Sequence, residues 1–219
     1  MKLLITSAGF TNKSISDALL EMASRPFGEL KLAFIPTAAN VKAGDKKWLI
    51  RHLLGCERLG FLEMDIIDFS ALPKNIWKSR MEEADVLVFG GGNTLHLTHC
   101  LKDSGLAELL PKMLEGKIYV GISAGGMILG KSLLVNQPRK TCCDKKFSAE
   151  IETGLGLIDF EIKPHLNSKN FPEATLENLE EFAKENPKTS FYAIDNDTAI
   201  KVVDGKAEVV SEGEWKKFN

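Results

Sequence analysis

Cysteine, histidine and long apolar runs are scarce in this chain of 219 residues, and each scarcity excludes a class of protein. The four cysteines show no C-x-x-C spacing, so a zinc site or a disulfide framework is not expected. The longest apolar runs are only as long as strands, and the N-terminal residues lack the apolar core of a signal peptide. The sequence therefore predicts a cytoplasmic protein with no metal, no cofactor and no membrane anchor.

The charge balance of the chain gives no sign of a nucleic-acid or membrane partner. Lysine and arginine number 28 against 30 aspartate and glutamate residues, which gives a formal net charge of −2. Without a basic field, binding to nucleic acid or to an anionic membrane is not expected. With 44% hydrophobic residues the chain has enough apolar material for a full core, and we expect one domain over residues 1–219.

Short apolar runs alternate with segments that have helical periodicity. The alternation predicts βαβ units, and therefore a three-layer α/β/α sandwich with a mostly parallel central sheet, as in flavodoxin-like folds. Near the C-terminus, Asp204-Gly205 between two alternating segments predicts a β-hairpin. The expected strands cover residues 2–6, 31–35, 64–69, 86–89, 118–122, 157–162, 191–194, 199–203 and 207–210, and the expected helices cover residues 14–24, 45–59, 94–102, 106–114 and 172–184.

The segment around Ser123 carries the clearest chemical signal. An apolar run ends in Gly121-Ile122-Ser123-Ala124-Gly125, and a helical pattern follows. This is the pattern of a nucleophile elbow, in which glycines two residues before and after the serine avoid collisions in a sharp strand-to-helix turn. The backbone N–H of Ala124 would then lie at a helix N-terminus, where it can donate to a developing oxyanion. The sequence therefore predicts a hydrolase with Ser123 as its nucleophile.

A glycine-rich loop, residues 90–94, follows the apolar run 86–89. Its exposed N–H groups could cradle a phosphate or supply a second oxyanion donor, and Gly91 and Gly92 are the candidates for the latter. It matches neither of the common phosphate-binding fingerprints, so the oxyanion role is favoured. Asn93 and Thr94 are candidate substrate contacts, although either could simply cap the helix that follows.

A serine needs a base, and His165 is the best candidate among four histidines. It follows an apolar run and Pro164, which places it at the end of a strand, whereas the other three lie inside helical patterns. The acceptor that orients the base could be Asp195 or Asp197, after the run 191–194, or Asp144, which could instead bind a cationic group of the substrate. The sequence does not choose among them.

In this order, the glycine loop 90–94, the elbow 121–125 and Pro164-His165 resemble the peptidase E family of aspartyl dipeptidases and cyanophycinases. The resemblance covers nearly the whole chain and implies a fold akin to class I glutamine amidotransferases. It implies Ser123 as nucleophile, His165 as general base, and an oxyanion hole formed by Ala124 and the glycine loop.

The resemblance also implies a third triad member just after the run 191–194, where the family has a glutamate. The natural register sets Asn196 at that position, and Asp197 or Asp195 could take over the role after a modest shift; Asp197 is preferred. For an acidic substrate group, the candidate cations are Arg139 and Lys140 after the elbow, and Lys163 or Lys169 flanking His165. Only Arg139 offers the planar donor fork that suits a carboxylate.

We therefore expect a serine peptidase that acts on dipeptides or short peptides, as a monomer or homodimer. The alternative is a catalytically impaired member that binds a small ligand, because the amide of Asn196 carries no charge to neutralise an imidazolium. A polar loop over residues 135–150 is expected to surround the site.

Overall fold

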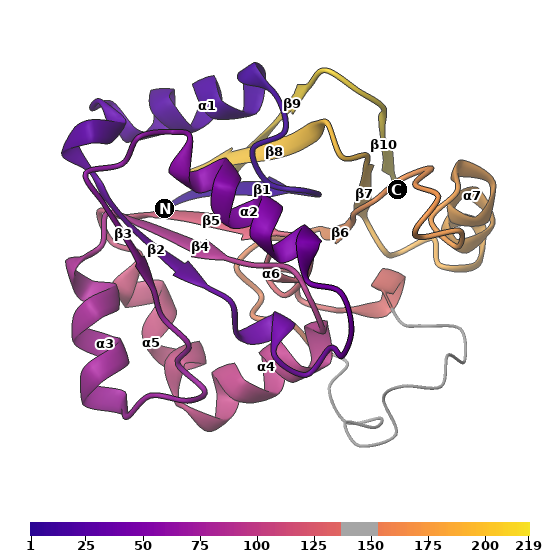
Figure 1. Ribbon diagram of the computed structural model, residues 1–219. Helices are drawn as coiled ribbons and strands as arrows, with labels where there is room; N and C mark the ends of the chain where they lie inside the picture. The colour runs from indigo at the N-terminus through magenta and orange to yellow at the C-terminus, as the bar shows by residue number, and fades with distance from the viewer. Residues whose placement is uncertain (137–152) are drawn as a thin grey trace.

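A computed structural model describes residues 1–136 and 153–219 of the chain. Within these residues, seven strands form one sheet in the order β3-β2-β4-β5-β1-β8-β9 (Figure 1). The first five of these run parallel, whereas β8 and β9 are antiparallel and form a hairpin at the edge next to β1. The strands are β1 (Lys2–Thr6), β2 (Lys31–Ile35), β3 (Glu63–Ile66), β4 (Val86–Phe89), β5 (Ile118–Ile122), β8 (Thr198–Val203) and β9 (Lys206–Ser211).

Helices cover both faces of this sheet, with α1 and α2 on one face and α3, α4 and α5 on the other (Figure 1). A short helix, α6, follows β5 directly. The helices are α1 (Lys13–Ala23), α2 (Lys47–Glu57), α3 (Lys74–Glu83), α4 (Thr94–Asp103), α5 (Leu106–Met113), α6 (Ala124–Met127) and α7 (Leu176–Glu185), with 3-10 turns at Phe27–Glu29, Thr37–Ala39 and Leu134–Asn136.

Alternation along the central strands divides the core in two. In β1, Leu4 packs with α1 and α2, while Leu3 and Ile5 face the opposite helices. Successive side chains of a strand point to opposite faces, and a parallel sheet covered on both faces needs apolar residues on each. This is why the central strands are continuous apolar runs, and why the layers form a three-layer sandwich.

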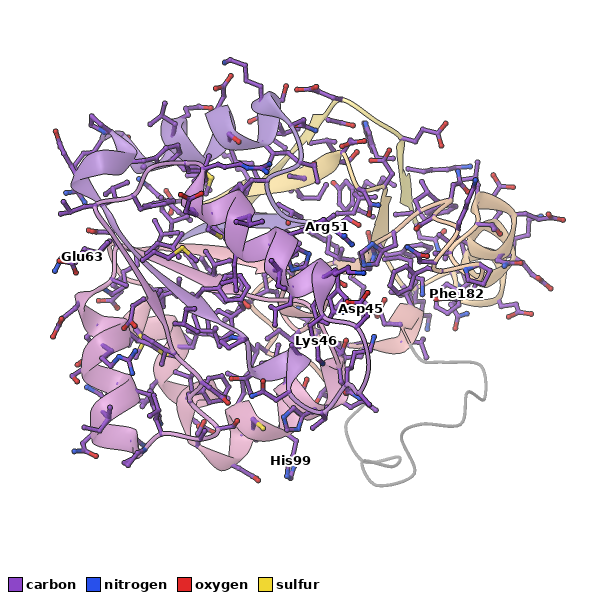
Figure 2. The ribbon with its side chains drawn as sticks, in the orientation of Figure 1. Asp45, Lys46, Arg51, Glu63, His99 and Phe182 are labelled. Carbon is purple, nitrogen blue, oxygen red and sulfur yellow. The ribbon has the colours of Figure 1, made fainter. Side chains whose placement is uncertain are left out.

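A second, smaller sheet lies beside the large one. Its order is β10-β7-β6, with β6 (Glu161–Lys163) parallel to β7 (Phe191–Ile194) and β10 (Trp215–Phe218) antiparallel to it. Helix α7 packs on this sheet through a third apolar cluster that includes Leu179 and Phe191, with Phe182 against it (Figure 2). None of the helices in the described part of the chain is long and apolar enough to cross a membrane.

The predicted three-layer α/β/α fold is confirmed, and the bounds of β1, β2, β4, β5 and β7 agree with those expected. The hairpin is also present, and Asp204 and Gly205 both adopt positive φ in its turn. Two expected strands are wrong in extent. Strand β3 ends at Ile66, and most of residues 157–162 form a loop before β6. That loop is apolar because Ile158 is buried, and the N–H of Leu157 donates to the carbonyl of Leu129 rather than to a strand.

Parallel pairing brings three loops to one edge of the large sheet. The carboxyl ends of β1, β4 and β5 are neighbours there, and Ser7, the loop 90–93 and Ser123 follow them in turn. Ligands of open α/β sheets bind at this edge, outside the carboxyl ends of the strands. The fold therefore predicts that these loops form the site.

Two glycines allow the turn from β5 into α6 to pack tightly. A Cβ on Gly121 would lie 2.6 Å from the carbonyl oxygen of Gly125, and a Cβ on Gly125 would lie 2.1 Å from that of Phe89 in β4. Both obstacles are backbone atoms, which cannot move aside as a flexible side chain would. The elbow therefore requires glycine at both positions because of close packing.

Replacing Gly125 should consequently destabilise the protein. We expect Gly125→Ala to lower the free energy of unfolding by about 2 kcal/mol or more, the scale of an overpacked core. Gly28→Ala is the matched control, because the nearest atom to its added Cβ is 3.9 Å away, and it should stay within about 0.5 kcal/mol of the parent. Urea unfolding of both variants measures the difference, and equal midpoints would contradict the packing argument.

Candidate active site

Ser123 lies between β5 and α6 in a strained backbone conformation. Its φ of 49° and ψ of −110° fall outside the regions that a residue with a side chain normally occupies. Such strain costs on the order of 1–3 kcal/mol and persists only where the surroundings enforce it. Here the N–H of Ser123 donates to the carbonyl of Thr6 at 2.9 Å, which joins the elbow to β1. The structure thus contains the sharp turn that the sequence predicts, with Ser123 partly exposed at its tip.

His165 stands next to this serine. Its Nε2 lies 3.0 Å from Ser123 Oγ, although the two residues follow strands of different sheets. The imidazole stacks on the ring of Phe171, with centroids 4.0 Å apart and an angle of 5° between the planes. Burial lowers the pKa of His165 below its usual range, and the nearby Lys163 lowers it further, while the hydrogen bond to Asn196 raises it. The ring is therefore held in place as a neutral base near neutral pH.

Asn196 occupies the position next to the second ring nitrogen. Its Oδ1 lies 2.9 Å from His165 Nδ1. The preferred candidate, Asp197, does not reach the ring and is exposed, so this preference was wrong. Asp195 has no hydrogen bond to it either: its carboxylate accepts from the N–H of Asp197 in the turn that joins β7 to β8, and from the N–H of Glu214 just before β10. Asp195 therefore stabilises the backbone around this turn, and the Asn196 amide is the side chain next to His165.

Ser7 is a contact that sequence reasoning missed. Its hydroxyl lies 3.1 Å from both His165 Nδ1 and Asn196 Oδ1, and it accepts a hydrogen bond of 2.8 Å from the backbone N–H of His165. The side chain is fully buried. The available signal was its position directly after β1, at the same sheet edge as the elbow.

The glycine loop lies next to the elbow, because a Cβ on Gly91 would lie 3.4 Å from Cβ of Ser123. Within the described residues, Gly90 N–H donates to Ile35 and Asn93 N–H to Ala38, but the N–H groups of Gly91, Gly92 and Ala124 have no protein acceptor. Gly92 could not be another residue, because a Cβ would lie 2.1 Å from the Ala38 carbonyl oxygen at a φ of +146°. The predicted oxyanion donors therefore remain available for a ligand.

Of the two residues after these glycines, Asn93 has a structural role and Thr94 lines the cleft. Asn93 caps α4 by accepting from the N–H of His96 at 2.8 Å, which is the structural role considered for it. Thr94 lines the cleft beside Ser123. Arg139 and Asp144, the other candidate substrate contacts, lie outside the described residues, as does most of the loop expected over residues 135–150.

A cleft of about 800 Å³ opens over Ser123 and His165. Positive side chains dominate its charged groups. Its described lining contains Lys42, Arg51, Arg58 and Lys163, against the single carboxylate of Glu173. Arg51 projects from α2, which lies in front of the large sheet in Figure 2. The cleft is thus suited to a substrate with negative charge.

Lys163 differs from the other three cations in its burial. It is partly buried two residues before His165, whereas Lys42, Arg51 and Arg58 are exposed. Burial lowers its pKa, which the charge of Glu173 partly offsets, and no carboxylate of the described residues lies within 4 Å of its ammonium group. A charge removed from water without a close partner is costly, so this lysine favours binding of an anion.

A second histidine, His52 of α2, also lines the cleft and lies beside Gly91. Burial lowers its pKa to about 4, and the charge of a protonated His165 would lower it as well. Its Nδ1 is buried without a hydrogen-bond partner among the described residues. No group of three or more potential metal ligands occurs in residues 1–136 and 153–219.

Comparison with known proteins gives one consistent result. The sequence model of peptidase family S51 matches residues 3–210. An uncharacterized peptidase of Listeria monocytogenes serovar 1/2a, Lmo0363, is 30% identical over 208 residues, which cover 91% of this chain and 94% of that protein. Peptidase E of Nostoc sp. is 29% identical over 186 residues, or 82% of this chain and 72% of the relative.

Solved structures agree with the sequence comparison. The crystal structure of a Listeria monocytogenes EGD-e protein assigned to peptidase E superposes with a TM-score of 0.79 at 25% identity, over 97% of this chain and 98% of that one. A peptidase from an acI-B1 actinobacterium gives a TM-score of 0.66 at 18% identity, over 98% of this chain and 88% of that one, and shows the same fold.

Proposed function

This chain belongs to peptidase family S51 and is a serine-type peptidase, and we propose that it hydrolyses dipeptides or short peptides with Ser123 as nucleophile and His165 as general base. The observation that carries the proposal is the 3.0 Å contact between Ser123 Oγ and His165 Nε2. A nucleophile and its base need this separation for proton transfer.

The proposed reaction follows the order of acyl transfer. Ser123 Oγ attacks the carbonyl carbon of the peptide bond while its proton passes to His165 Nε2. The tetrahedral intermediate collapses when the C–N bond breaks and His165 gives this proton to the leaving amine. Water then attacks the acyl-serine ester while His165 takes its proton. The ester C–O bond breaks as His165 returns this proton to Ser123 Oγ, which releases the acid and restores both side chains.

The negative charge of the intermediate needs donors that are in place before the reaction. The N–H of Ala124 and those of Gly91 and Gly92 support this role, because they have no described protein acceptor, and Gly91, Gly92 and Ser123 line the cleft. Fixed donors of this kind act without reorganisation and are worth about 3–4 kcal/mol each in other serine peptidases.

The charge of the cleft supports a substrate with a carboxylate near the scissile bond. An N-terminal aspartate or glutamate would place such a group close to Lys163, which is two residues from His165. The opposite charges would offset the cost of burying each one singly. Lys163 is one of the candidates that the sequence offers for this role, among which Arg139 was preferred for its planar fork.

The alternative of an impaired member that only binds a small ligand rests on the neutral side chain of Asn196. The contacts of His165 favour catalysis over this alternative, because both ring nitrogens have partners suited to the general-base role. An amide oxygen orients an imidazole as a carboxylate does, although it stabilises the imidazolium less.

Removing the nucleophile should abolish hydrolysis. We expect Ser123→Ala to lower kcat by on the order of a thousandfold or more. The unfolding midpoint should change little, because the hydroxyl lies at the partly exposed tip of the turn. His165→Gln should cost a similar factor, and the double variant little more, since the two side chains act as one unit. Turnover of a dipeptide panel by purified protein measures this, and near-native turnover of Ser123→Ala would show that the nucleophile lies elsewhere.

Removing the buried cation should change specificity. We expect Lys163→Gln to lower kcat/KM for Asp-Leu by roughly thirtyfold, corresponding to the loss of about 2 kcal/mol from a charged hydrogen bond. The isosteric neutral substrate Asn-Leu should change by less than about twofold, since it makes no ion pair with residue 163. Lys112→Gln on α5 is the control for loss of a surface charge. A parent enzyme that cleaves Asp-Leu and Asn-Leu equally well would rule out acidic specificity.

A further inference from the structure

The triad proposed above ends in an asparagine, and an asparagine poses a problem that a carboxylate does not. A carboxylate presents acceptor atoms only, whereas an amide presents an acceptor oxygen at one end and a donor nitrogen at the other. If the oxygen faces His165, the ring proton is held on Nδ1 and Nε2 is free to accept from Ser123. If the nitrogen faces it, the favoured tautomer carries its proton on Nε2 and cannot act as a base.

The amide alone has no preference between these two orientations. A group that contacts both the amide and the ring must therefore favour one of them, and Ser7 contacts both. Its Oγ is 3.1 Å from Asn196 Oδ1 and 3.1 Å from His165 Nδ1, and it accepts the backbone N–H of His165 at 2.8 Å. The side chain is fully buried, so water does not compete for these bonds.

We propose that Ser7 is a positioning residue, and that its hydroxyl holds the oxygen of Asn196 toward His165 and thereby keeps Nε2 free for Ser123. The inference rests on the proposed function only in giving that free Nε2 a catalytic use.

The numbers of donors and acceptors around Ser7 favour the orientation with the oxygen toward His165. With the oxygen inward, the hydroxyl of Ser7 and the Nδ1–H of His165 both donate to Asn196 Oδ1, which has two lone pairs. The backbone N–H of His165 donates to Ser7 Oγ, so every donor has an acceptor.

With the nitrogen inward, the set of Ser7, Asn196 and His165 has one acceptor fewer than it has donors. One amide hydrogen can go to the free lone pair of Ser7 Oγ, but the other amide hydrogen and the hydroxyl hydrogen of Ser7 compete for the single lone pair of Nδ1. One buried donor stays unsatisfied, which disfavours this orientation. In Ser7→Ala the hydroxyl hydrogen no longer competes for Nδ1, and the backbone N–H of His165 loses its acceptor in both orientations alike. A water in the vacated space can donate to the amide oxygen or accept from the amide nitrogen, so the preference for one orientation is lost.

Strand pairing holds Ser7 in the position that these hydrogen bonds require. Ser7 follows β1 directly, and β1 pairs with β5 before Ser123 and with β8 after Asn196. The register sets Thr6 opposite Ile122 on one side and opposite Ala199 on the other. Ser7 is therefore fixed relative to both functional side chains by strand pairing rather than by a mobile loop.

The direct test is the tautomer of His165, read from the ¹⁵N signals of labelled histidine at a pH where the ring is neutral. In the parent protein we expect Nε2 to be the unprotonated nitrogen, and in Ser7→Ala we expect both nitrogens to show averaged signals. The His165→Gln variant identifies the resonances. An unchanged tautomer in Ser7→Ala would overturn the inference.

A double-mutant cycle separates this role from simple structural support. We expect Ser7→Ala to lower kcat by roughly tenfold or more with little change in KM, because fewer molecules carry the productive tautomer. In an Asn196→Asp background, where no donor end exists, the same change should cost less than about threefold. Equal losses in both backgrounds would mean that Ser7 serves only to support the backbone of His165, and would contradict the proposal.

Two controls separate an effect on the tautomer from a loss of folding. Ser7→Thr, which keeps the hydroxyl, should retain the parent tautomer, and unfolding midpoints report whether each variant is folded. A Ser123→Ala enzyme with normal turnover would remove the proposed function and leave the tautomer result intact, so the two failures are distinguishable.

Discussion

Strand β1 pairs with β5 on one side and with β8 on the other, and this double pairing fixes the position of Ser123 after β5 relative to Asn196 before β8. Its last residue, Thr6, accepts a hydrogen bond from the N–H of Ser123 and lies opposite Ala199 in β8. Because side chains alternate along a strand, a shift of one residue in either register would turn the whole set to the other face. The site therefore depends on β1 even though the residues that react come from three other segments.

The contacts around His165 describe a base that remains neutral rather than one that is paired with an acid. Burial and the positive charges of Lys163 and Lys42 lower its pKa, and no carboxylate of the described residues bonds to the ring. The lowered pKa favours the neutral base, but the imidazolium formed during attack is stabilised less than beside a carboxylate. The same cations that disfavour this imidazolium favour an anionic substrate, whose carboxylate would return part of the missing negative charge.

Much of the fold follows from the sequence because the parallel strands are buried on both faces. Runs such as Val86–Phe89 are apolar throughout, which identifies them without ambiguity. Helix α3 was missed because only Trp77 and Met81 of its ten residues are buried, so its apolar periodicity is weak. Strand β10 was missed because it is short and half of its residues are lysine.

The site was predictable where a residue type is required by the backbone, and less so where side-chain direction decides. The elbow and the glycine loop are tied to turns that need glycine, and the sequence identifies them. The sequence does not identify the third triad member, because residues 195–197 are adjacent and only the turn between β7 and β8 determines which of them faces His165. Ser7 has no signature beyond its place after a strand, and Lys42, Arg51 and Arg58 reach the cleft through tertiary packing alone.

The central claim is that Ser123 is a nucleophile activated by His165. Reaction with a fluorophosphonate, followed by intact mass and peptide mapping, measures that activation without any assumption about the natural substrate. The account predicts a single adduct per chain, located on Ser123, with a labelling rate that falls sharply when His165 is replaced by glutamine. No adduct on the parent protein, or an adduct on another residue, would contradict it.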